Sequence, residues 1–363
     1  MKTPKLLCTI AAIALAQGSL FAVNTDPVGF VSFTVLGNSD ATLAVPMNRT
    51  SEFKGLTSAL SGISGSVTIT VAGTPGWTAG QFAPLATANK TYALQLASGA
   101  KEGLVLPITN NGTNTVTVTV SASDNLTGVL ASGEQIDIMP YWTPATLFPT
   151  PPPVGSELIG FANPDNGVNV GASEVYQYAG SNAWEDGING GSATHAPLQF
   201  GTSFILRNAG ASTITLSLVG GVPMTAHRIR ISTQANNTEQ DVAIGYMSPI
   251  AERLSTIGLP AYNPAEPTNS NNLKQGEAAS ANALGFPVAT GDSIIGFDNS
   301  EPGINKGAAE VYQWTGSAFE DQINGGIITN SVTLKPGFGY IFRKAATPTP
   351  TTVVWTHLQG YLQ

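Results

Sequence analysis

Short stretches in which aliphatic and hydroxyl-bearing residues alternate recur along this chain. Residues 67–71, 115–120 and 213–218 each show a period of two, which places aliphatic side chains on one face of an extended segment and hydroxyls on the other. Helical periodicity is scarce, and only residues 52–60, 252–257 and part of 273–284 indicate short helices. The pattern predicts an all-β fold of half-buried antiparallel strands with few short helices.

An internal duplication is the most informative feature, because residues 156–208 return as residues 292–344. Both copies hold a Val-Tyr-Gln phrase followed by an aromatic-Glu-Asp phrase, and the segment between the two phrases is one residue shorter in the second copy. A turn tolerates such a change, whereas a strand would flip its faces, so the phrases predict a β-hairpin. Closing strands are expected at 204–207 and 340–343.

The duplication sets the expected domain organisation. Residues 23–132 are predicted to form an amino-terminal antiparallel β-domain, followed by two related modules of β-sandwich or barrel type. The first module is expected over 133–238, with a Pro-rich connector at 149–155. The second is expected over 239–363, with a long loop or insert at 260–290.

The first 22 residues predict export. Lys2 and Lys5 precede an apolar run at 6–16, and Ala22 offers a small residue for cleavage, so residues 1–22 are expected to be a signal peptide. Cys8 is the one cysteine and lies inside this run, so the mature chain is expected to carry no thiol. No later stretch approaches about 18 unbroken apolar residues, and a membrane span is therefore not expected. The predicted location is secreted, cell-surface or periplasmic.

The charge balance narrows the expected partners. The chain has 15 basic and 23 acidic residues, a net charge of −8, and it contains no basic run. Loss of Lys2 and Lys5 with the signal would take the charge to −10. Nucleic acid and anionic lipid are poor partners for such a chain. With 40 Gly and 24 Pro, the composition is typical of short strands joined by tight turns.

Several phrases resemble a known family. They are TDPVGFVSFTV near the amino terminus, the SGAKEG turn, PYWTPATLFP, and the repeated VYQY and Trp-Glu-Asp elements. Together they resemble a paralogous family of secreted, conserved hypothetical proteins of Verrucomicrobia, over nearly the whole mature chain. The resemblance implies an exported, envelope-associated or extracellular β-rich protein, and it transfers no catalytic residue.

Repeated acidic residues are candidates for chemistry or for structure. Glu174, Glu185 and Asp186 recur as Glu310, Glu320 and Asp321. Paired carboxylates about 5–9 Å apart act as acid and nucleophile in glycosidases. Arg207 and Arg343 also recur, and ion pairs of Glu174 with Arg207 and of Glu310 with Arg343 would explain both repeats without catalysis. We favour the structural ion pairs, because duplicated structural modules retain both copies of a feature.

An oxygen-rich loop in each copy is a candidate calcium site. Asp165 and Asn169 in the first copy correspond to Glu301 and Asn305 in the second, among further Asn and Gly residues. Such oxygen ligands suit Ca²⁺, although the spacing matches no EF-hand. Asn, Asp and Gly also form turns by bonding their own backbone, which is the favoured interpretation. Calcium is the one cofactor that the sequence suggests.

Aromatic residues alternate along each predicted hairpin and form one face. They are Tyr176, Tyr178, Trp184, Tyr312, Trp314 and Phe319. An exposed aromatic face would stack on sugar rings, whereas a buried one is core, and core is favoured. His195, His227 and His357 are the three histidines, and a zinc site is a less favoured interpretation than ordinary surface or core positions.

These observations favour a secreted, non-catalytic structural or interaction protein of the cell envelope or extracellular space. Its expected partners are polysaccharide or other envelope proteins. One alternative is a carbohydrate-binding protein that uses exposed aromatics, and another is a glycan-acting hydrolase that uses Glu174 or Glu310.

Overall fold

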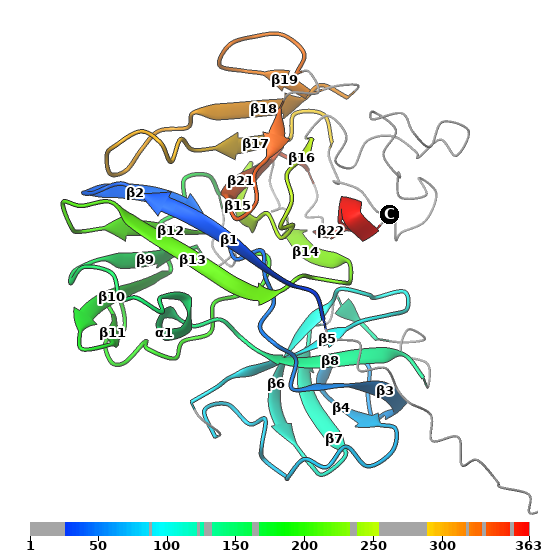
Figure 1. The fold of residues 1–363 in the computed structure, drawn as a ribbon. Coiled ribbons are helices and arrows are strands. Elements are labelled where there is room, and N and C mark those ends of the chain that lie inside the picture. Colours follow the sequence, from blue (N-terminus) through cyan, green and yellow to red (C-terminus); the bar gives the residue numbers. More distant parts are fainter. Residues whose placement is uncertain are drawn as a thin grey trace, which may run out of the picture.

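A computed structural model describes residues 26–86, 89–121, 124–126, 133–161, 167–232, 238–253, 289–316, 319–328, 332–348 and 352–362. These residues form antiparallel strands arranged as a closed barrel and two further β-modules (Figure 1). The all-β prediction is confirmed. Within the described residues no helix has the length and apolar character needed to cross a membrane.

A six-stranded barrel occupies the lower part of Figure 1 and closes in the order β3-β4-β7-β6-β5-β8. Its strands are β3 (Phe53–Leu60), β4 (Gly65–Val71), β5 (Tyr92–Leu96), β6 (Val105–Asn111), β7 (Thr115–Val120) and β8 (Gln135–Pro140). The period-two stretches at 67–71 and 115–120 lie in β4 and β7, and their alternate valine and isoleucine side chains fill the barrel core.

The helix expected at 52–60 is wrong, because these residues form β3. Phe53–Leu56 pair with β8 and Thr57–Leu60 pair with β4, with a bulge between Thr57 and Ala59. Pairing on both edges outweighs the weak helical pattern of the isolated segment. The helices expected at 252–257 and 273–284 lie outside the described residues, apart from Glu252–Arg253, which form strand β16.

The first module combines strands from before and after the barrel. Its five-stranded sheet has the order β11-β10-β9-β12-β2, and a separate ribbon pairs β1 with β13. The bounds are β1 (Val28–Val35), β2 (Ser39–Leu43), β9 (Glu157–Gly160), β10 (Glu174–Gly180), β11 (Ala183–Asp186), β12 (Phe204–Asn208) and β13 (Ile214–Gly221). The stretch at 213–218 is confirmed as a strand in β13.

The second module repeats this plan with continuous sequence. Its sheet has the order β15-β21-β17-β18-β19, and β14 pairs with β22. The bounds are β14 (His227–Ser232), β15 (Gln240–Gly245), β17 (Ser293–Gly296), β18 (Glu310–Trp314), β19 (Phe319–Asp321), β21 (Gly339–Lys344) and β22 (Thr352–His357). The predicted hairpins are β10–β11 and β18–β19, and the predicted closing strands are β12 and β21.

The strand order corrects the expected boundaries 23–132, 133–238 and 239–363. β1 and β2 belong to the first module, and the barrel, residues 53–140, is inserted between β2 and Tyr141. β14 belongs to the second module, where β15 leads directly to Tyr246. The two modules therefore correspond in strand order beyond 156–208 and 292–344, with β1 and β2 of the first matching β14 and β15 of the second.

Four small elements complete the described structure. α1 (Pro144–Leu147) is one turn, capped by a reciprocal hydrogen-bond box between Thr143 and Thr146. The expected connector at 149–155 follows α1 without regular secondary structure. Strands β16 (Glu252–Arg253) and β20 (Thr333–Leu334) pair with each other, and η2 (Gly360–Leu362) is a 3-10 turn. Most of the expected insert at 260–290 and all of residues 1–22 lie outside the described residues.

Candidate functional site

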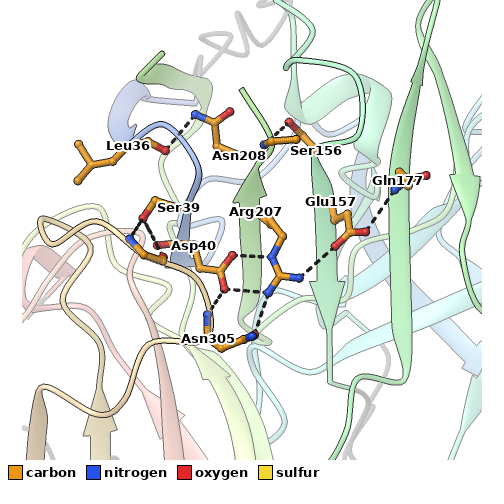
Figure 2. A network of polar contacts seen from close by, with 11 residues as sticks. Leu36, Ser39, Asp40, Ser156, Glu157, Gln177, Arg207, Asn208 and Asn305 are labelled. Carbon is orange, nitrogen blue, oxygen red and sulfur yellow. Dashed lines mark hydrogen bonds and ion pairs between the residues drawn. The ribbon is translucent and has the colours of Figure 1, made fainter. Parts of the chain in front are cut away.

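Arg207 on β12 binds Asp40 on the neighbouring strand β2 (Figure 2). Its Nε lies 2.8 Å from Asp40 Oδ1 and its Nη2 lies 3.0 Å from Oδ2, which is a bidentate ion pair. These hydrogen bonds to Asp40 raise the pKa of Arg207. Glu157 on β9 lies on the other side, with its Oε2 3.5 Å from Arg207 Nη1.

A residue of the second module completes this site. The backbone N of Asn305 donates to Asp40 Oδ2 at 2.8 Å, and the Asn305 side-chain oxygen accepts from Arg207 Nη2 at 2.9 Å. Asn305 lies in the loop between β17 and β18, so this loop crosses onto the sheet of the first module.

The second module contains the equivalent site with the roles exchanged. Arg343 on β21 binds Asp241 on β15, with Nε to Oδ1 at 2.7 Å and Nη2 to Oδ2 at 2.9 Å. Asn169, from the β9–β10 loop of the first module, donates its backbone N to Asp241 Oδ2 at 2.8 Å. Its side-chain oxygen lies 3.5 Å from Arg343 Nη2.

Backbone hydrogen bonds also join each module to a loop of the other module. Asp40 N donates to Gly303 O and Asp241 N donates to Gly167 O, both at 2.9 Å. Gly303 and Gly167 have φ values of 133° and 120°, which favour glycine. We call each set a clamp: Asp40, Arg207 and Asn305 form the first, and Asp241, Arg343 and Asn169 form the second. Each module thus holds the loop of the other.

The expected ion pairs of Glu174 with Arg207 and of Glu310 with Arg343 are wrong. Arg207, Glu157 and Gln177 are in register across β12, β9 and β10 and share one face. Glu174 is three residues from Gln177, so strand alternation places it on the opposite face. Glu310 and Gln313 repeat this relation, and the Glu310 carboxylate lies 3.6 Å from Lys335 Nζ.

Three of the calcium candidates, Asn169, Glu301 and Asn305, lie within the described residues. Asn169 and Asn305 are parts of the clamps, and the Lys306 ammonium donates to the backbone oxygens of Asp298 and Glu301, both at 2.8 Å. A lysine ammonium therefore already binds two carbonyl oxygens of this loop. Asp165 lies outside the described residues. In the part of the chain that is described, no cluster of three or more His, Cys, Asp or Glu is placed to hold a metal ion.

The six hairpin aromatics are core, so they do not form an exposed sugar-binding face. Tyr176, Tyr178, Trp184, Tyr312, Trp314 and Phe319 are all 9% exposed or less. The first three pack with Phe148 and β13, and the last three form the core of the second module. Burial raises the pKa of Tyr312 to about 12.

The repeated acids are separated by the sheet. Glu185 pairs with Gln177, so it lies on the face opposite to Glu174, and the two cannot flank one glycosidic bond. Asp186 caps a turn by accepting from Ile188 N and Asn189 N, both at 2.9 Å, and Asp321 does the same for Ile323 and Asn324. Hydrogen bonds from Asn189 lower the pKa of Asp186.

Glu174 lines a pocket of 40 Å³, which has room for only a few waters. Burial raises the pKa of its carboxyl group.

Two histidines meet at the second ribbon. His227 and His357 are register partners in β14 and β22, and His357 Nε2 lies 2.6 Å from Glu252 Oε2. Burial lowers the pKa of His227 to about 3. His195 lies between β11 and β12 in the other module.

Asp40 and Asp241 are the site residues that the sequence interpretation missed. Each is the second residue of a short strand, in the run Asp-Ala-Thr-Leu of β2 and Asp-Val-Ala-Ile of β15, and this similarity was the available signal. A comparison of the chain with family models, with curated proteins and with solved structures finds no match.

Proposed function

We propose that this chain is an exported, non-catalytic structural or interaction protein of the cell envelope or extracellular space. One observation carries the proposal: the recurring Asp, Arg and Asn residues of the two clamps hold the modules together. Arg207 and Arg343 bind aspartates, Asn169 and Asn305 cross to the other module, and Asp186 caps a turn. These uses explain the repeated residues by module contact and by turn formation, without catalysis.

Stability outside the cytoplasm would not depend on disulfides in this fold. The predicted signal peptide contains the single cysteine, so the mature chain would rely on burial and backbone pairing without disulfides. Three apolar cores, one in each module and one in the barrel, supply that burial. The resemblance to secreted proteins of Verrucomicrobia is a further reason to propose export.

The glycan-acting alternative has a specific weakness in this geometry. Glu174 and Glu185 lie on opposite faces, and the pocket beside Glu174 is 40 Å³, smaller than the range of about 300–1,000 Å³ common for ligand sites. Carbohydrate binding by the six hairpin aromatics is disfavoured by their burial.

Two measurements test the proposal. Fractionation of producing cells should place the chain outside the cytoplasm, and a cytoplasmic chain would contradict export. The purified mature chain should release no reducing ends from a polysaccharide panel, with or without calcium. Release that disappears in Glu174→Gln or Glu310→Gln, with Glu185→Gln as the matched control, would show that the chain is a hydrolase.

A further inference from the structure

A groove of 560 Å³ lies where the barrel meets the first module. The β2–β3 connection contributes Arg49, Thr50 and Glu52, the barrel contributes Lys90, and the first module contributes Trp142 and Val219. The carboxyl end of β13 points towards the barrel at this junction (Figure 1). The volume is within the range of about 300–1,000 Å³ that is common for small-ligand sites.

Arg49 is the distinctive group in this groove. Its guanidinium is half-buried and lies over the Trp142 ring, 5.6 Å from the ring centroid. Among the residues that the structure describes, none accepts a hydrogen bond from this guanidinium. Burial lowers the pKa of Arg49. A half-buried cation without an acceptor gains most from a ligand that brings a carboxylate, because both groups then form charge-assisted hydrogen bonds.

The neighbouring carboxylate is already engaged. Glu52 Oε1 accepts from Lys90 Nζ at 2.5 Å, and Glu52 Oε2 accepts from the Tyr92 hydroxyl at 2.9 Å. Two cations and one carboxylate therefore line the groove, and the field there favours an anion. The net negative charge of the whole chain acts weakly at this point, because salt screens charges beyond about 8 Å at physiological ionic strength.

The rim of the groove is apolar and exposed. Val219 is 63% exposed and pairs with Phe30, which is 74% exposed, in the β1–β13 ribbon. Thr50 adds an exposed hydroxyl. The guanidinium and hydroxyl that line the groove, with the exposed Val219–Phe30 pair at its rim, match a sugar that has a carboxylate, an aliphatic ring face and hydroxyls.

We propose that this groove binds a uronic-acid unit of an acidic polysaccharide, with the carboxylate on Arg49 and the aliphatic ring face against Val219 and Phe30. The proposal rests on the interaction role proposed above and gives it a ligand class. The site is separate from the hairpin aromatics and from Glu174 and Glu310.

Titration calorimetry of the full mature chain with trigalacturonate tests the proposal, with the methyl-esterified trimer as the neutral probe. The acid is expected to bind at least tenfold more tightly than the ester. Arg49→Gln should weaken binding of the acid about 10- to 100-fold. Phe30→Ser, at an exposed position, should weaken it about fivefold. Arg228→Gln is the matched control, a half-buried arginine at the other barrel junction, and should leave affinity unchanged.

Glu52→Gln gives a readout that misfolding cannot imitate. Removal of the one carboxylate from the groove should raise affinity for trigalacturonate several-fold, and added salt should reduce the gain. Equal affinity for acid and ester, or unchanged affinity in both Arg49→Gln and Glu52→Gln, would overturn the proposal. The proposal would also be overturned if the groove bound an acetylated apolar tripeptide with a free carboxylate and did not bind the sugar. None of these results bears on the fractionation or reducing-end measurements.

Discussion

The first clamp gives a sharp stability prediction through Asp40→Asn. Asp40 is 5% exposed and its carboxylate accepts from Arg207 Nε, Arg207 Nη2 and Asn305 N. Asparagine keeps the shape and one acceptor oxygen but loses the charge and one of the two acceptors. The guanidinium then keeps one oxygen of residue 40, Asn305 Oδ1 at 2.9 Å and Glu157 Oε2 at 3.5 Å.

The size of the effect follows from burial. Removal of one partner of a fully buried ion pair costs about 3–5 kcal/mol. The Arg207 side chain is 27% exposed, so water screens part of the lost charge and we expect about 2 kcal/mol. Asp241→Asn should cost a similar amount, because Asp241 holds Arg343 and Asn169 with matching distances.

Equilibrium urea unfolding, followed by tryptophan fluorescence, measures both variants. Asp26→Asn is the matched control: Asp26 lies 2.5 Å from Lys54 Nζ, but both side chains are more than a third exposed, so the loss should be below about 0.5 kcal/mol. If Asp40→Asn and Asp26→Asn cost the same, or if Asp40→Asn and Asp241→Asn differ by more than about twofold, the reasoning on paired clamps is refuted.

Three further predictions concern other parts of the molecule. Gly337 has a φ of 71°, and an added Cβ would lie 2.0 Å from the Phe33 ring, so Gly337→Ala should lower the free energy of unfolding by about 3 kcal/mol in thermal unfolding. Gly190→Ala, with open space around its Cβ, should lower it by about 1 kcal/mol. Equal losses in the two variants would contradict the packing argument. His227 has a folded pKa of about 3 against about 6.5 unfolded, so the unfolded chain binds the extra proton and about 4 kcal/mol of stability should be lost as pH falls from about 6.5 to about 3. The variant His227→Phe keeps the neighbours His357 and Glu252. Its urea unfolding midpoint should fall less between pH 7 and about pH 4 than the midpoint of the unsubstituted chain. An equal fall in both chains would exclude His227 as the cause. Millimolar calcium should leave the melting temperature unchanged, because Lys306 already satisfies the carbonyl oxygens of Asp298 and Glu301; a calcium-dependent rise would contradict this assignment.

The strands could be predicted because their signal is local. Val67, Ile69 and Val71 alternate with threonines, and one buried face is sufficient to produce that pattern. The hairpins were predictable because a one-residue length change marked their turns. Segment 52–60 was misjudged because its pairing with β4 and β8 depends on residues that are distant in sequence.

The partner of Arg207 was mispredicted for a reason that strand parity could have shown. Glu174 lies an even number of positions from the core residues Tyr176 and Tyr178, so all three share one face of the strand. A hairpin with the two tyrosines inside therefore directs Glu174 away from an outward arginine. The true partner, Asp40, lies 167 positions from Arg207, beyond the reach of a contiguous repeat. The inserted barrel separates Asp40 from Arg207 in the sequence, and no local pattern of residues indicates that they pair.

The split first module has a consequence for the order in which the chain can fold. The barrel is contiguous in sequence, so it can close its hydrogen-bond ladder once residue 140 is available. Strand β1 must wait for β13, since Ser32 and Ser217 meet across 185 positions, and the loop-closure entropy for that contact is correspondingly large. A chain that emerges amino terminus first therefore holds its earliest strands unpaired for longest, and their exposed edges are open to wrong pairing during synthesis.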